Sequence, residues 1–115
     1  NIEATIDEQD IFNVTMNESL AVALLTNLLK NAFVHNIDGG HIRITVTKNS
    51  ITFRNSGVEN PLEREHIFER FYQGTKKEGS TGLGLAIADS ICRLQHLNIR
   101  YYFEQKEHCF EISRQ

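Results

Sequence analysis

Two stretches with helical periodicity, each followed by a pair of strand-like runs, constrain the fold of this chain most strongly. Apolar residues recur every three or four positions over 20–33 and again over 83–97. Apolar residues alternate over 42–46 and 51–53 after the first stretch, and over 99–103 and 109–112 after the second. We therefore predict two long helices and two β-hairpins.

Polar residues mark where the first predicted helix begins and ends. Thr15 and Glu18 have the spacing of a capping box, and Asn17 is an alternative cap. The helix runs to about His35, and the two glycines at 39–40 end it. Residues 11–14 before it are predicted to form a short strand.

A shorter helix is predicted between the two hairpins. Asn60 is placed to cap it, and Pro61 occupies the first helical position. This helix would extend through Phe68, and 73–80, which is polar and contains glycine, would be a mobile loop. Asn98 would end the last long helix in a left-handed turn.

This order of elements predicts an α+β fold. We expect a two-layer sandwich, with a mixed, mostly antiparallel sheet covered on one face by about three helices. The 115 residues fit one domain spanning 1–115. The formal net charge is −3, so the chain lacks the basic character of a nucleic-acid-binding domain and we expect no nucleic-acid partner. No apolar run has the ~20 residues that cross a bilayer.

Polar residues form a stripe on the first long helix. Asn27, Asn31 and His35 are spaced four residues apart, so they lie one above another beside the apolar face. Burying an unpaired amide costs about 1–3 kcal/mol, so these groups need partners. A bound nucleotide or metal would supply them; the alternative is a solvated helix edge.

The second long helix follows a glycine-rich segment, Gly-Ser-Thr-Gly-Leu-Gly-Leu at 79–85. Glycine lets the backbone approach a ligand, and the N–H groups of a helix N-terminus attract anions. This segment lacks the Gly-Lys-Ser/Thr ending of the Walker loop, and no parallel strand directly precedes it as in the dinucleotide fingerprint. It predicts a phosphate site, with a glycine-rich hinge as the alternative.

Four motifs together resemble the ATP-binding catalytic domain of bacterial sensor histidine kinases. Residues 27–32 (Asn-Leu-Leu-Lys-Asn-Ala) look like the asparagine box of that family, and 55–57 (Asn-Ser-Gly) occupy the place of its first glycine box. Residues 67–72 (Ile-Phe-Glu-Arg-Phe-Tyr) match its phenylalanine box, and 82–87 its second glycine box. The resemblance covers about 11–113 and implies the Bergerat fold, which gyrase and MutL ATPases share.

The resemblance implies a site for ATP and Mg²⁺. Asn31 would hold the Mg²⁺ that bridges the phosphates, with Asn27 near the same phosphates, and His35 would stack on the adenine. The loop 73–80 would be the lid, anchored by burial of Phe68 and Phe71, with Tyr72 beside them. The ATP-binding residues implied are Asn27, Asn31, His35, Asn55, Gly57, Lys76, Lys77, Thr81, Gly82, Leu83 and Gly84.

Several positions depart from the family pattern. Asn55 stands where an Asp accepts a hydrogen bond from the adenine amino group, so that bond loses its charge assistance. Glu59 replaces a glycine, and Val34 and Gln73 stand where the family often has Lys and Arg. Lys76 and Lys77 in the lid could replace these cations electrostatically; the alternative is the solvated role that is commoner for surface lysines.

The implied function is transfer of the γ-phosphate of ATP to a histidine on a separate dimerisation domain, and then to a response regulator. Asn27 stands where gyrase-like ATPases have a Glu that activates water, and an amide is no general base. We therefore expect a phosphotransferase domain, inactive alone, monomeric, and cut from a longer protein. The resemblance implies a cytoplasmic domain of an inner-membrane protein, with membrane contact only through missing parts.

Two other functions stay open from the sequence. The departures at 34, 55, 59 and 73 would also fit a degenerate domain that acts as an interaction module. A gyrase- or MutL-like ATPase is the third reading, and Asn27 argues against it. His41, His66, His96 and His108 read as surface or element-end residues without a role in the site.

Overall fold

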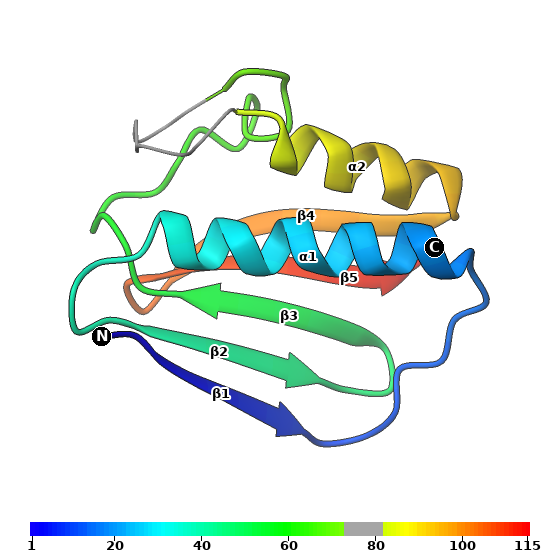
Figure 1. Cartoon of the computed structure of the whole chain (residues 1–115), viewed down its shortest axis with the longest axis horizontal. Helices are drawn as coiled ribbons and strands as arrows, with labels where there is room; N and C mark the ends of the chain where they lie inside the picture. The colour runs from blue at the N-terminus through cyan, green and yellow to red at the C-terminus, as the bar shows by residue number, and fades with distance from the viewer. Residues whose placement is uncertain (73–81) are drawn as a thin grey trace.

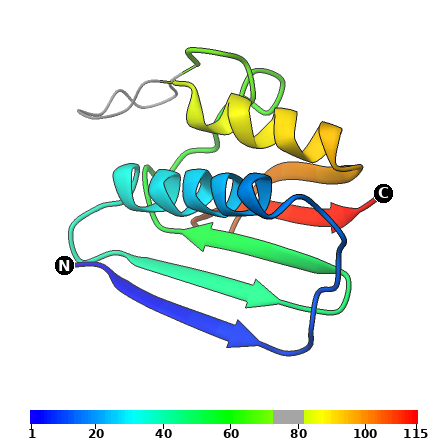
Figure 2. The same cartoon turned by 45° about the vertical axis from the view of Figure 1, so that its right-hand side comes forward.

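The structure, a computed structural model, describes residues 1–72 and 82–115, which form one five-stranded sheet with both described helices on one face (Figures 1 and 2). The helices are α1 (Glu18–Val34) and α2 (Gly84–Leu94). The strands are β1 (Glu3–Glu8), β2 (His41–Val46), β3 (Ser50–Asn55), β4 (Leu97–Glu104) and β5 (Glu107–Arg114). The two-layer α+β fold is confirmed.

The sheet is mixed and mostly antiparallel, as predicted. Its strand order is β1-β2-β3-β5-β4, and only the β1–β2 pair is parallel. The core lies between the sheet and the helices. It contains Leu24 and Leu28 of α1, Ala88 and Ile91 of α2, and Phe53, Phe110 and Ile112 of the sheet. This core fixes α1 and α2 side by side above the sheet, which positions the site.

The prediction of a strand at 11–14 is wrong, and the first strand lies earlier, at Glu3–Glu8. Every β1 residue is exposed, so alternation of buried side chains gave no signal there, and the strand forms by backbone pairing with β2. Residues 11–14 are instead held by side chains. Phe12 packs against the core, and the Arg114 guanidinium lies over the Phe12 ring and donates to the Asn13 carbonyl.

The start of α1 distinguishes the two predicted caps. The side-chain oxygen of Asn17 accepts a hydrogen bond from the Leu20 N–H at 3.1 Å, so Asn17 is the cap. From there Leu24, Leu28 and Ala32 recur on one face and are buried. That buried face leaves the stripe of Asn27, Asn31 and His35 beside it, on the side toward α2.

The short helix predicted from Asn60 through Phe68 is wrong, so the described residues contain two helices and not about three. Residues 63–72 form consecutive turns instead, in which the N–H groups of His66, Glu69 and Tyr72 each donate to the carbonyl three residues back. The N–H groups of Leu62 and Glu63, which would begin the helix, donate to the Tyr101 and Tyr72 hydroxyls. These tertiary partners therefore take the place of the predicted side-chain cap at Asn60.

The end of α2 also differs from the prediction. The helix ends at Leu94, and His96, with φ of 58°, is the left-handed residue that follows it. Asn98 lies in β4 instead. The second predicted hairpin is confirmed, and a tight turn in which Gln105 and Lys106 both have positive φ joins its strands.

Candidate functional site

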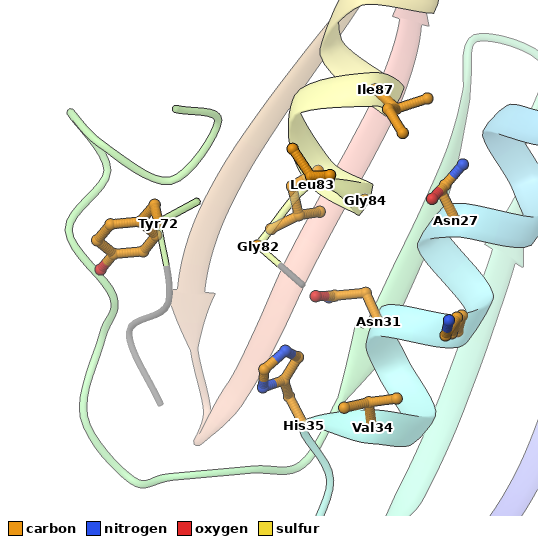
Figure 3. Close-up of a pocket in the computed structure, with 11 residues that line it drawn as sticks. Asn27, Asn31, Val34, His35, Tyr72, Gly82, Leu83, Gly84 and Ile87 are labelled. Atoms are coloured by element: carbon orange, nitrogen blue, oxygen red, sulfur yellow. The ribbon is translucent and has the colours of Figure 1, made fainter. Parts of the chain in front are cut away.

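A cavity of about 200 Å³ lies between α1 and the N-terminus of α2 (Figure 3). The side of α1 supplies one wall and residues 82–87 the other, with Tyr72 beyond them. Figure 3 shows the Asn31 amide extending from α1 toward Gly82 and Gly84. The lining residues described are Asn27, Lys30, Asn31, Val34, His35, Tyr72, Gly82, Leu83, Gly84, Leu85 and Ile87.

Asn27 is oriented by its own helix. Its Nδ2 donates to the Ala23 carbonyl at 2.8 Å, which leaves Oδ1 directed toward α2. A Cβ built on Gly84 would lie 3.1 Å from this Oδ1, so the glycine lets α2 approach α1 closely. The sequence prediction that the asparagine stripe and the glycine segment form one site is therefore matched by their positions.

The N-terminus of α2 is suited to an anion. No described side chain caps the helix, and its first turn contains no acidic residue. Backbone N–H groups at a helix start have no partner within the helix, and the helix dipole favours negative charge there. The asparagine amides of α1 face this end, so a phosphate between them would meet donors from two sides.

The segment after β3 lies against the end of α1. A Cβ on Gly57 would lie 2.8 Å from the His35 carbonyl oxygen and 3.1 Å from Cδ2 of His108. Glycine therefore lets 55–57 pack beneath His35, at the inner edge of the site. Asn55 is 2% exposed and does not line the cavity itself.

Asn55 carries a buried polar atom without a partner. Its Nδ2 donates to the Ser56 carbonyl at 2.8 Å, while its Oδ1 has no hydrogen-bond partner among the described residues. Buried polar atoms are almost always paired, since leaving one unpaired costs about 1–3 kcal/mol. The amide is therefore held so that it presents an acceptor and not a donor.

A buried network that the sequence did not reveal fixes the end of α1. The Oδ1 of Asn36 accepts from the Ser56 hydroxyl at 2.6 Å, and its Nδ2 donates to the carbonyls of Ala32 and His41. Asn36 is 5% exposed. It ties α1 to β2 and to the segment after β3, and its only sequence signal was an amide directly after the helix.

The predicted lid anchors behave differently from one another. Phe68 packs edge-on against Phe110 in the core, and the Tyr72 hydroxyl accepts from the Glu63 N–H. Phe71 is 65% exposed, so its predicted burial is wrong. Instead its N–H donates to the Gly82 carbonyl at 2.6 Å, which joins the two ends of the predicted lid.

Part of the predicted site lies outside the described residues. This part contains Lys76, Lys77 and Thr81 together with Gln73. Lys30 is a lining residue that the sequence analysis missed, although it occupies the same helical face as Asn27 and Val34.

His108 is not the surface residue that the sequence suggested. It is 5% exposed, and burial lowers its pKa. Its Nε2 lies 2.7 Å from the Val58 carbonyl, which only accepts, so this nitrogen carries the proton. Its Nδ1 then accepts from the Tyr101 hydroxyl at 2.8 Å, and Tyr101 accepts from Leu62 N–H.

This arrangement defines a class of protein, an α+β domain built around an anion-attracting cavity between two helices. A family model described as "Histidine kinase-, DNA gyrase B-, and HSP90-like ATPase" matches residues 16–113. The chain therefore belongs to this family.

One relative is the sensor histidine kinase RppB of Synechocystis, 43% identical over 84 residues, which are 65% of this chain and 18% of that protein. The chain thus spans about a fifth of the length of the curated relatives it matches. The mycobacterial sensor histidine kinase MprB has the same fold, with a TM-score of 0.84 and 22% identity over 98% of this chain and 84% of that one. The nucleotide-free catalytic domain of histidine kinase ThkA matches with a TM-score of 0.81 and 25% identity over 96% and 76%.

Neither of the described helices is long and apolar enough to span a bilayer.

Proposed function

We propose that this chain binds Mg-ATP between α1 and α2 and donates the γ-phosphate to a histidine on a separate dimerisation domain of the same protein. The observation that carries the proposal is that the amides of Asn27 and Asn31 face the glycine-rich N-terminus of α2 across one cavity. Such a site holds a phosphate chain by backbone N–H groups on one side and amides on the other.

The residues fit a magnesium ion held jointly with the nucleotide. Among residues 1–72 and 82–115, no group of three or more His, Cys, Asp or Glu side chains is placed to hold a metal. Mg²⁺ prefers oxygen ligands, retains water, and commonly takes few protein ligands when phosphates supply the rest. Asn31 would contribute one amide oxygen, and the bound Mg-ATP would supply the phosphoryl group.

The adenine end of the site would lie toward 55–57. The Oδ1 of Asn55 has no described partner and can accept a hydrogen bond from the adenine amino group. His35 lines the cavity, and its own backbone carbonyl lies against Gly57. The His35 ring would stack on the base. The Asn55 amide would thus replace the Asp carboxylate without its charge.

Asn27 favours phosphotransfer over hydrolysis. The amide projects toward the phosphate side of the cavity, and it cannot take a proton from water at neutral pH. The γ-phosphate would therefore persist until a protein nucleophile reaches it. We propose that the phosphate then passes to an Asp of a response regulator, and that this domain is the cytoplasmic part of a membrane-anchored kinase.

Calorimetric titration of Mg-ATP tests this proposal. We expect the unaltered domain to bind with negligible turnover, and Asn31→Ala to weaken binding at least about tenfold, or about 1.4 kcal/mol. Asn98→Ala is the matched control, because Asn98 is exposed on β4 and does not line the cavity. Phosphotransfer is then tested by adding the dimerisation domain of the same protein and following label from the γ-phosphate.

The outcomes separate this function from its alternatives. No binding by the unaltered domain would favour a degenerate interaction module, with Asn55 and Glu59 as the first positions to restore. Rapid hydrolysis in the absence of a dimerisation domain would favour an ATPase of the gyrase type.

A further inference from the structure

The described lining of the cavity between α1 and α2 is poor in positive charge for a site that would hold a triphosphate. Of the lining residues that the structure describes, Lys30 is the only one with a permanently charged side chain. Val34, which the same helix also presents to the cavity, is apolar. The phosphate chain of ATP carries several negative charges, and Mg²⁺ neutralises only part of them.

Helix geometry places Lys30 at the edge of the asparagine stripe. At roughly 100° per residue, Lys30 lies about 60° to one side of Asn27, and His35 about 80° to the other side. Asn31 lies between these edges. Because His35 contacts the segment after β3, Lys30 occupies the opposite edge of the site. Its long side chain can reach over the cavity from there.

The Lys30 ammonium has no competing carboxylate nearby on its helix. The residues three and four positions away are Asn27, Phe33, Thr26 and Val34, none of which is acidic. Six ion pairs are present within 1–72 and 82–115, and Lys30 takes part in none of them. It also makes no side-chain hydrogen bond with the residues in these ranges. An anion in the cavity would therefore not have to displace a described partner.

We propose that Lys30 binds the phosphate chain of ATP and makes the site prefer nucleotides with more phosphates. This inference rests on the proposed function and assigns to α1 the positive charge that Val34 does not provide. Lys30 is exposed, and an exposed lysine contributes little when it pairs with a single mobile charge. A bound phosphate chain instead places several negative charges at one fixed position within its reach. The effect should therefore grow with the number of phosphates on the ligand.

The test compares Lys30→Met, which keeps a similar unbranched side chain and removes the charge, with Lys30→Arg. Lys48→Met is the matched control, since it changes the net charge equally from an exposed turn between β2 and β3. Mg-ATP, Mg-ADP and adenosine are titrated into each variant. We expect Lys30→Met to weaken Mg-ATP about tenfold, to weaken Mg-ADP less, and to leave adenosine unchanged, with Lys30→Arg close to the unaltered domain.

Salt provides a second readout. The affinity of the unaltered domain for Mg-ATP should fall with salt more steeply than that of Lys30→Met, because one screened charge contact is missing in the variant. Equal losses for Mg-ATP and adenosine, or a loss no larger than that of Lys48→Met, would overturn the proposal. Failure of the unaltered domain to bind Mg-ATP would instead overturn the proposed function, and this inference with it.

Discussion

Asn55 is a single side chain with a role in the stability of the domain and a proposed role in ligand binding. Its Nδ2 bonds the Ser56 carbonyl, and this bond sets which end of the amide is left for a ligand. A carboxylate could not donate to Ser56. The asparagine therefore satisfies the local backbone and still offers an acceptor; its bond to the Ser56 carbonyl is the part that the family pattern did not suggest.

Asn55→Asp should therefore lower the free energy of unfolding at pH 7. We expect a loss of about 1–3 kcal/mol, because a buried carboxylate would face the Ser56 carbonyl. The loss should shrink as the pH falls, since a protonated carboxyl can donate to that carbonyl. Urea denaturation measures both effects, with Asn98→Asp as the exposed control. Unchanged stability would mean that the Asn55 amide lies in the opposite orientation.

A close backbone contact joins the two residues that flank the predicted lid, Phe71 and Gly82. The Phe71 N–H bonds the Gly82 carbonyl, and both residues have positive φ, 66° and 73°. A Cβ on Gly82 would lie 2.6 Å from the Phe71 Cα. Glycine is thus required where the chain enters α2, for its conformation and for its contact with Phe71.

Gly82→Ala should reduce Mg-ATP affinity at least about tenfold, because the shifted backbone displaces the N-terminus of α2. Gly39→Ala is the control, since Gly39 has a similar φ of 72° but nothing within 4 Å of its Cβ position. Gly39→Ala should cost about 1–2 kcal/mol of stability from φ alone and leave affinity unchanged. Equal affinities for the two variants would show that the contact with Phe71 does not position the site.

The whole molecule is an unevenly covered sheet. The helices contact each other, α1 also contacts β3 and α2 contacts β4, while β1 is exposed along its length. The β1 strand contains Glu3, Asp7 and Glu8, and such charges disfavour pairing of sheet edges between copies. This arrangement supports the expectation of a monomer, which sedimentation at increasing concentration would check.

His108 connects distant parts of the molecule and gives its stability a pH dependence. It bonds the loop after β3 through Val58 and the segment 60–72 through Tyr101 and Leu62. Burial lowers the pKa of His108, so the unfolded chain binds a proton more readily than the folded domain. Stability from this group is complete above the unfolded pKa of about 6.5 and is lost as the pH falls toward the lower folded value.

We expect the free energy of unfolding to decrease between about pH 7 and pH 5, because a protonated Nδ1 cannot accept from Tyr101. His108→Gln, which can donate at one end and accept at the other, should show a smaller decrease over this range. Urea denaturation at several pH values provides the measurement, and His66→Gln is the exposed control. An identical pH dependence for His108→Gln and the unaltered domain would contradict this account.

The sequence by itself determined the elements whose signals are local. Helical periodicity over 20–33 and 83–97 and alternation in the two hairpins depend on burial of one face, so they predicted α1, α2 and four of the five strands. The asparagine stripe and the glycine segment were also readable, because their spacing follows helix geometry. Their facing positions across one cavity agree with what the motifs implied.

Only the tertiary structure decided the features that depend on partners far away in the sequence. β1 forms by pairing with β2. The N–H groups of Leu62 and Glu63 are bound by tyrosine hydroxyls where a side-chain cap was predicted, and His108 is buried beside Val58, 50 residues away. The position of Lys30 at the cavity and the missing partner of Asn55 Oδ1 likewise depend on the tertiary structure. Propensity and periodicity report the local chain, whereas a hydrogen bond to a distant residue changes which local conformation has the lowest free energy.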